Sequence, residues 1–342
     1  MLGEGIFKRF SLVWVPLIGI LFLLLFIFIL SDEPFKALYF FFWGPFRSVF
    51  SFGNMLNASV PLILGALGIT IAMKAGNLNL GGEGQIYLGA FVTTAAALEL
   101  SSIGLMGAFA AVAAGSFLSG VLAGFSGYCK AKWNTNELIS TFLLSCAVIP
   151  VVNYLVTGPF LDPETSLLST GKIADNMRLP LILKPSGLSA GFLIAVVFVF
   201  IVDFFLKKTR TGYEIRMTGH NELFARYGGI NTKYNTVITM ILSGFFYGLA
   251  GGILVLGTHY AVIREFSSGL GWSALTAALI ARFSPIAVIP CALFLAWIEA
   301  GARSAMQNTG LTFETAYIAQ AVIFFLSTSL VIRNIFTREG RG

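Results

Sequence analysis

Long apolar runs constrain this chain more than any other feature of its sequence. A helix of about 20 apolar residues matches the thickness of the hydrocarbon core of a bilayer. Such runs follow one another with short polar breaks between them, at 10–30, 55–73, 83–97, 105–127, 138–156, 187–206, 236–257, 272–281, 286–300 and 316–332. The sequence therefore predicts an all-α polytopic membrane protein of about ten transmembrane helices.

Two of these runs, 83–97 and 272–281, are too short for a full span, and each begins after a glycine-rich polar segment. Short runs of this kind are typical of broken or re-entrant helices. Each also follows a long glycine-containing run, 55–73 or 236–257, and these two long runs point in opposite directions in a ten-span arrangement. This pairing predicts an inverted repeat.

Composition leaves no room for a separate soluble domain, because 56% of the 342 residues are hydrophobic and only 11% are charged. We expect one membrane domain over residues 1–342, with the aromatic segment Phe35–Phe52 lying at the membrane interface. Its predicted parts are a retained first span at 10–30, a first core half at 55–156, a sixth span at 187–206, a cytoplasmic coupling loop at 207–233 and a second core half at 234–332.

The positions of Lys and Arg predict the orientation of the spans. If both termini lie on one side, about fifteen of these residues fall in loops on that side and about seven on the other. Cytoplasmic loops carry the excess of Lys and Arg. We therefore predict that both termini and the basic block 207–233 are cytoplasmic, and that the loop 161–187 lies outside.

The basic block contains a short segment with the signals of a capped helix. Asn221 is an N-cap residue, Glu222 places a negative charge in the first turn, and Gly228 with the next glycine supplies a terminator. Leu223 and Tyr227 lie four residues apart and so share one face. A helix this short needs a partner surface, which is either another subunit or the protein's own bundle.

The segment 74–85 is polar and glycine-rich although it lies between apolar runs. Irregular backbone at membrane depth must be buried in protein or line a water-filled cavity. Glu83 enters the third span almost at once, and an intramembrane carboxylate is a candidate functional group. The alternative is structural, with Glu83 capping a helix while Asn79 and Gln85 satisfy neighbouring backbone groups.

Signals of catalysis, metal binding and nucleic-acid binding are missing from the sequence. The two histidines lie far apart in loops, and no phosphate-binding loop is present, so we expect no catalytic residue, no metal and no cofactor bound by this chain. The net charge of +6 is spread between apolar runs, which argues against a nucleic-acid partner. We interpret Cys129, Cys146 and Cys291 as small core residues.

Several motifs together resemble one transporter family. Asn79–Gln85 is similar to the Asn-Ile-Gly-x-Glu-Gly-Gln signature of nucleoside permeases in the ribose and branched-chain amino acid ABC importer superfamily. Gly219–Ile230 resembles the coupling segment of that family, and Gly271–Pro285 and Ser304–Gln307 resemble two further blocks. The likeness covers roughly residues 55–307 in the same order. Three positions depart from the family pattern: Gly82 stands where Val is common, Glu222 where Pro is usual and Ser273 where Asp is usual.

The resemblance implies a permease subunit in a bacterial inner membrane that moves a small polar solute, above all a purine nucleoside, by alternating access. The implied partners are a subunit that binds ATP, a second permease or a second copy of this chain, an extracytoplasmic substrate-binding lipoprotein, and membrane lipid. The implied substrate path contains Asn79, Glu83, Gln85, Trp272 and Ser273. The implied contact with the ATPase contains Asn221, Glu222, Leu223, Arg226, Tyr227 and Gly228.

Other functions stay open at this point. A permease of the same superfamily could carry sugars or branched-chain amino acids. A secondary transporter would use Glu83 or Glu299 as a proton site, and would work without an ATPase. A structural or sensory membrane protein would show no solute-dependent change.

Overall fold

The computed structural model describes residues 31–310 and a few single positions between 21–29 and 318–325. The described chain is mostly helical. The helices that carry most of the structure are α2 (Pro34–Trp43), α3 (Val49–Lys74), α4 (Gly82–Glu99), α5 (Leu105–Trp133), α6 (Glu137–Thr157), α7 (Gly191–Lys208), α8 (Arg210–His220), α9 (Glu222–Tyr227), α10 (Thr232–Leu254), α11 (Leu270–Ile280) and α12 (Pro285–Asn308). Short 3-10 turns lie at Gly44–Phe46, Ser101–Ile103 and Asp175–Met177, and a π-helical turn, Val255–His259, extends α10.

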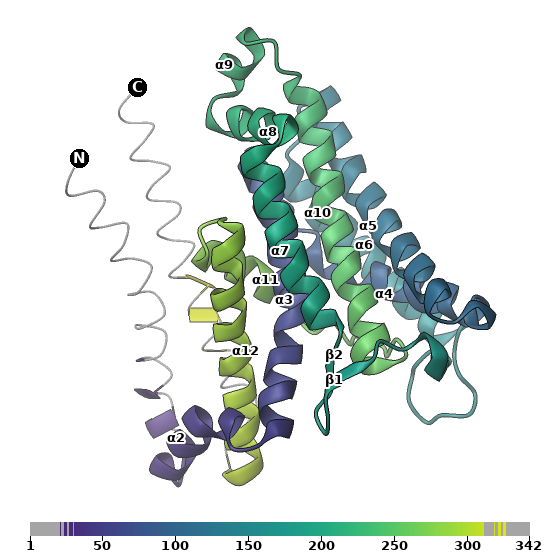
Figure 1. The fold of residues 1–342 in the computed structure, drawn as a ribbon, viewed down its shortest axis with the longest axis vertical. Coiled ribbons are helices and arrows are strands. Elements are labelled where there is room, and N and C mark those ends of the chain that lie inside the picture. The colour runs from purple at the N-terminus through teal and green to yellow at the C-terminus, as the bar shows by residue number, and fades with distance from the viewer. Residues whose placement is uncertain are drawn as a thin grey trace.

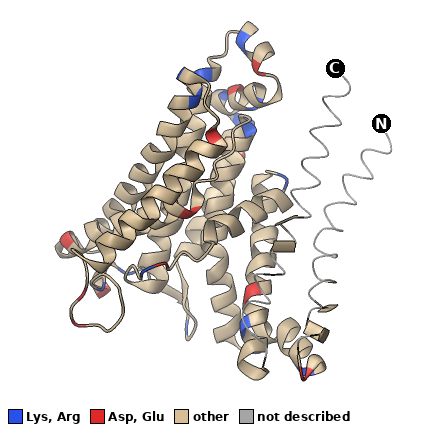
Figure 2. Cartoon of the chain, turned by 180° about the vertical axis from the view of Figure 1, so that it is seen from behind, with Lys and Arg blue, Asp and Glu red and all other residues tan. Residues whose placement is uncertain are grey.

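The long helices form an elongated bundle with α3 and α10 near its centre (Figure 1). Helices α8 and α9 lie at one end, which we call the α8–α9 end. At the opposite end lie α2 and a small antiparallel hairpin of β1 (Leu181–Leu183) and β2 (Leu188–Ser189). Lys and Arg gather at the α8–α9 end (Figure 2), as expected for a cytoplasmic side.

The prediction of an all-α polytopic membrane protein is confirmed. Within the described part of the chain, five helices are long and apolar enough to cross a membrane: α3, α5, α6, α12 and the helix formed by α10 with its π-helical turn. Helices α4, α7 and α11 coincide with the three remaining predicted spans between residues 55 and 300. The predicted spans at 10–30 and 316–332 lie outside the described residues, apart from single positions.

The structure corrects several details of the prediction. Helix α3 begins at Val49, inside the segment expected at the interface, and the sixth span begins at Gly191 because 188–189 pair as β2. The basic block holds a second helix, α8, whose first turn is capped by the Thr209 hydroxyl. Cys146 is exposed on α6 rather than part of the core, because α6 buries only one of its faces.

Glycines set the contact between α10 and α5. Gly244 and Gly248 pack against the Ser119 turn of α5, and a β-carbon on Gly244 would collide with the Ser119 carbonyl oxygen. On the facing helix, a β-carbon on Gly124 would collide with the side chain of Ile241. Small residues let helix backbones approach closely, so these glycines fix the position of α10 in the bundle.

We predict that Gly244→Ala lowers the thermal stability of the purified protein in detergent. The added methyl group has no space between α10 and α5, and overpacking of this kind costs about 1–3 kcal/mol. Gly310→Ala is the control, because no atom of the described residues lies within 4 Å of the position of its β-carbon. An unchanged melting temperature for Gly244→Ala would show that the contact is looser than described.

Candidate functional site

Two half-helices meet head to head inside the bundle. Helix α4 starts at Gly82 and α11 starts at Leu270, and Gly271 lies so close to the backbone of Glu83 that any side chain there would collide with it. Helix α3 leads into α4 and α10 leads into α11, while α3 packs on α11 and α10 packs on α4. This arrangement agrees with the predicted inverted repeat.

Glu83 links the two half-helices. Its Oε1 accepts a hydrogen bond from the backbone N–H of Gly269 at 2.9 Å, and its Oε2 accepts one from the N–H of Gly271 at 2.8 Å. The carboxylate lies in the first turn of α4 and also at the first turn of α11, so it faces the positive ends of two helix dipoles. From the sequence, one alternative was that Glu83 caps a helix. Glu83 does cap a helix, and that helix is α11.

The loop before α4 is held by buried side-chain amides. The Asn79 amide nitrogen donates to the Gln85 amide oxygen at 2.8 Å and to the Ser243 hydroxyl of α10 at 3.1 Å, and its amide oxygen accepts from the Gly81 N–H at 2.9 Å. Asn79 and Gln85 are 0% and 1% exposed. These bonds satisfy irregular backbone that would otherwise lack partners at membrane depth.

Two hydroxyl groups of α6 complete the support of this loop. Thr141 accepts a hydrogen bond from the Leu80 N–H at 3.1 Å, and Ser145 accepts one from the Gly84 N–H at 2.7 Å. Neither residue was singled out from the sequence. The sequence pattern that could have identified them is a pair of small polar residues, four positions apart, in an otherwise apolar run. This spacing places both side chains on one face of a helix.

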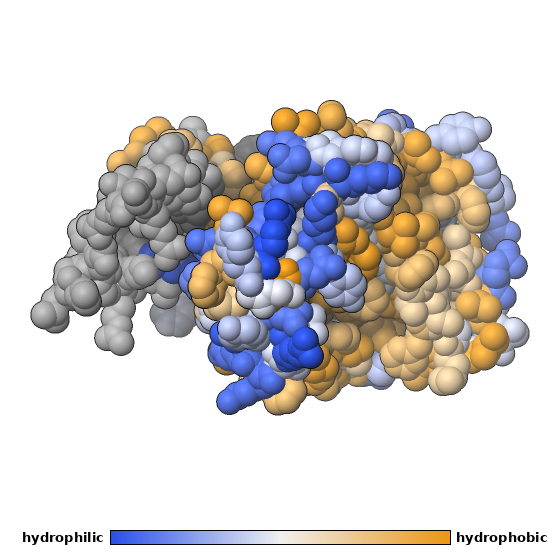
Figure 3. All heavy atoms as spheres, turned by 90° about the horizontal axis from the view of Figure 1, so that it is seen from above, coloured by the Kyte–Doolittle hydropathy of each residue, from blue (hydrophilic) through white to orange (hydrophobic). Residues whose placement is uncertain are grey.

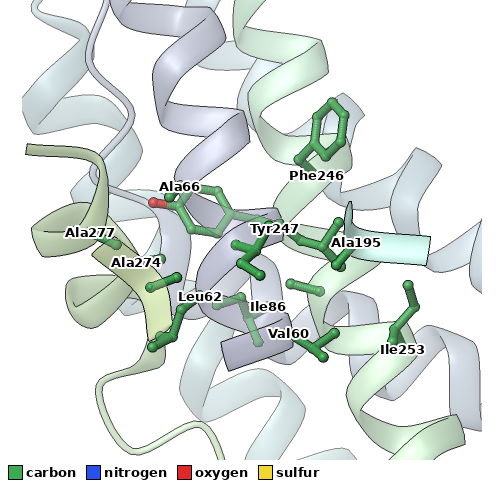
Figure 4. Packing of buried hydrophobic residues seen from close by; sticks show 14 of the residues in the cluster. Val60, Leu62, Ala66, Ile86, Ala195, Phe246, Tyr247, Ile253, Ala274 and Ala277 are labelled. Carbon is green, nitrogen blue, oxygen red and sulfur yellow. The ribbon is translucent and has the colours of Figure 1, made fainter. Parts of the chain in front are cut away.

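A narrow crevice lies at the junction of the half-helices. Its lining residues are Asn79, Leu80, Glu83, Tyr247, Gly271, Trp272 and Leu275, and it leaves no room for a water molecule. Tyr247 reaches it from α10 and is otherwise surrounded by residues of the buried core, as Figure 4 shows. Of the five residues predicted for the path, three line the crevice, whereas Gln85 is buried behind it and Ser273 follows Trp272 on α11.

Trp272 is the exposed aromatic residue of this junction. It is 41% exposed, and its ring lies edge-on to Phe142 of α6 at 6.4 Å between centroids. A second edge-on contact joins it to Phe324. The junction thus combines a carboxylate that is already hydrogen-bonded with an aromatic surface that can accept a further flat or apolar group.

Helix α9 forms a second candidate site, at the α8–α9 end. The Asn221 side chain caps it by accepting from the Phe224 N–H at 2.9 Å, and Gly229 ends it with φ of 80°. Both predictions for this helix are confirmed, although the left-handed residue is Gly229 and Gly228 is the C-cap. Glu222 and Arg226 form an ion pair along its exposed side at 3.5 Å.

Three large apolar side chains of α9 are exposed beside this ion pair. Leu223, Phe224 and Tyr227 are 65%, 68% and 91% exposed, while Ala225 is the residue that packs on the bundle. Phe224 was missed from the sequence because it lies one residue beside the predicted Leu223–Tyr227 stripe. Exposed apolar side chains grouped in this way can be covered by another protein, which favours the partner-surface interpretation.

The described residues give little support to a metal site or to Glu299 as a proton site. Within residues 31–310 no group of three or more His, Cys, Asp or Glu side chains is placed to hold a metal ion. Glu299, the alternative proton site, is paired with Arg303 one turn later on α12 at 2.6 Å. Neither observation adds a catalytic group to the junction.

Comparison with known proteins identifies the family. The family model described as "Branched-chain amino acid transport system / permease component" matches residues 51–328, which include both half-helices and α9. The chain belongs to this permease family. Members of the family are transport subunits, which is consistent with a non-catalytic role for this chain.

Relatives of this permease carry several names. It is 33% identical to a protein of Treponema pallidum described as "Probable riboflavin import permease protein RfuC", over 86% of this chain and 79% of that protein. It is 32% identical to a glucose ABC transporter permease of Haloferax volcanii, over 88% and 82%. It is 29% identical to a guanosine ABC transporter permease of Bacillus subtilis, over 95% and 96%. No solved structure matches the chain.

We predict that Glu83→Gln destabilises the permease. A glutamine side chain can accept only one of the two backbone hydrogen bonds, and its amide group would point donor hydrogens at the other N–H. Loss of one hydrogen bond to a charged group costs about 1.5–3 kcal/mol. Thermal unfolding in detergent measures the effect. Glu99→Gln, at the exposed end of the same helix, is the control, and equal melting temperatures for the two variants would contradict the linking role of Glu83.

Proposed function

We propose that this permease forms the translocation path of an ABC importer in a bacterial inner membrane, and that its solute is a small molecule with an aromatic heterocycle, above all a purine nucleoside. The observation that carries the proposal is the junction of α4 and α11. Discontinuous helices that meet inside a membrane bundle are a common place for transported solutes to bind. The names of the riboflavin and guanosine permeases also support it, because both solutes contain a flat heterocycle.

Trp272 supports the choice of a heterocycle over a sugar. Its ring is partly exposed beside the crevice, and stacking of a base on an aromatic side chain contributes about 1–3 kcal/mol. Glu83 has both oxygens occupied by backbone N–H groups, so it is proposed to shape the path and to hold the half-helices rather than to carry protons. A glucose permease among the relatives makes a sugar the competing solute.

Energy and delivery come from partner subunits in this proposal. An ATPase subunit binds ATP and receives the exposed face of α9, and this chain binds no cofactor. A substrate-binding lipoprotein delivers the solute at the end that carries β1 and β2, which is proposed to lie outside, and both termini are proposed to be cytoplasmic. A second guanosine permease of Bacillus subtilis also resembles this chain, which supports pairing with a different permease rather than with a copy.

The proposed mechanism is alternating access. ATP binding and hydrolysis move the subunit that holds α9, and α9 passes the motion to the bundle through Thr232, whose hydroxyl donates to Glu222 at 3.2 Å. The crevice at the junction is closed in this structure, since no water molecule fits. Transport therefore requires the crevice to open from the side of Trp272 and Phe142, and that opening is what the ATPase is proposed to drive.

We predict that Trp272→Ala raises the KM for guanosine uptake by about tenfold in proteoliposomes that contain the whole transporter, because the stacking surface is lost. Trp272→Phe keeps an aromatic ring and should retain most of the affinity. Uptake is measured for guanosine, uridine and ribose. If the transporter took up ribose but neither nucleoside, and if Trp272→Ala did not change that uptake, the solute would be a sugar rather than a heterocycle.

We predict that Leu223→Ala combined with Tyr227→Ala abolishes copurification of the ATPase and ATP-driven uptake, while the permease still inserts in the membrane. Interface side chains of this size typically cost more than 1 kcal/mol each when truncated. Met106→Ala with Phe109→Ala is the control, since both side chains are exposed on α5 near the opposite end. Normal copurification of the ATPase with the α9 variant would show that α9 is not part of the interface.

A further inference from the structure

A group of positive charges lies where α3, α7 and α8 meet at the α8–α9 end. We call it the cationic cluster, and its members are Lys74, Lys207, Lys208 and Arg216. The close packing of Gly219 explains why these charges lie together, because this residue of α8 touches the backbone carbonyl of Lys74 at the end of α3. Arg216 stands one turn before Gly219, and Lys207 and Lys208 lie in the last turn of α7, which packs on both α3 and α8.

Of the four cations of this cluster, only Lys207 is paired with a carboxylate of the described residues. Asp203 pairs with Lys207 at 2.7 Å, while the nearest acid on α8, Glu214, pairs with Arg210 instead. Among the described residues, no carboxylate lies within ion-pair distance of Lys74, Lys208 or Arg216. Like charges held together raise the free energy of the fold unless an anion shares them.

An apolar stripe on α7 leads into the cluster. Its members are 51–64% exposed and follow one another at helical spacing: Leu193, Val197, Phe200, Ile201 and Phe204. Lys207 and Lys208 continue the stripe by one more turn, at the end of α7. Seen from the α8–α9 end, hydrophilic side chains gather in the middle of the molecule, and apolar surface lies beside them (Figure 3).

We propose that the cationic cluster binds the phosphate group of an anionic phospholipid whose acyl chains lie along the exposed stripe of α7. The stripe supplies the apolar surface that acyl chains require, and the cluster supplies positive charge at the depth of the headgroup. The α8–α9 end carries the excess of Lys and Arg, which places it at the leaflet that holds anionic lipids. A soluble anion would use the cluster but leave the stripe without a role, and the tip of α9, where the ATPase is proposed to bind, is a separate surface.

The test compares the full-length chain with Lys74→Gln combined with Arg216→Gln, both purified in a non-ionic detergent. Removal of two like charges relieves repulsion, so the variant should melt at the same or a higher temperature than the unmodified chain when no lipid is added. Phosphatidylglycerol should raise the melting temperature of the unmodified chain and leave that of the variant unchanged. Native mass spectrometry should show about tenfold less phosphatidylglycerol retained by the variant.

Three controls and one further cluster variant separate this proposal from its competitors. Lys132→Gln with Lys233→Gln removes one cation from the last turn of α5 and one from the first turn of α10, and should keep the full response to phosphatidylglycerol. Phosphatidylcholine and glycerol 3-phosphate should give no rise, because one lacks the net charge and the other lacks acyl chains. Lys208→Gln changes an exposed side chain without disturbing the packing, and should lose part of the response.

Several results would overturn the proposal. One is an equal response of the cluster variant and the unmodified chain to phosphatidylglycerol. Another is an equal rise with glycerol 3-phosphate, which would indicate a site for a soluble anion. A third is loss of ATPase copurification by the cluster variant with its lipid response intact, which would assign the cluster to the subunit interface.

Discussion

The bond between Glu83 and the first turn of α11 is the interaction on which the centre of this permease depends. Two helices that start inside a membrane expose eight backbone N–H groups in all, since each leaves about four without a partner. One carboxylate in the first turn of α4 satisfies two of those of α11 and offsets the positive ends of both dipoles. Without it, the positive ends of α4 and α11 would face each other with no compensating charge.

The surroundings of this bond explain why the loop before α4 is polar. Asn79 pairs with Gln85 and with Ser243, and the hydroxyl groups of α6 accept from the N–H groups of Leu80 and Gly84. Tyr247 closes the junction from α10, where glycines let α5 and α4 approach. The polar residues therefore hold a rigid frame, and Trp272 is left as the large side chain that faces outward from it.

Much of this architecture could be predicted from the sequence because hydrocarbon thickness and backbone hydrogen bonding restrict membrane helices so strongly. The short runs at α4 and α11 and the cap at Asn221 were readable for the same reason, since each depends on neighbouring residues. The partner of Glu83 was not readable, because Gly269 and Gly271 lie 186 and 188 positions away. Helix α8 was missed because its apolar face is narrow: of its apolar side chains, Ile215 is buried, whereas Tyr213 is 51% exposed.

The central claim is that the junction of α4 and α11 opens to water during transport. The most direct measurement is labelling of Trp272→Cys by a membrane-impermeant thiol reagent in the assembled transporter, with Cys129, Cys146 and Cys291 replaced by Ser. Phe200→Cys on the exposed stripe of α7 serves as the lipid-facing reference. The account predicts that labelling at position 272 changes with ATP while labelling at position 200 stays low throughout. Lack of reaction at position 272 in every nucleotide state would contradict it.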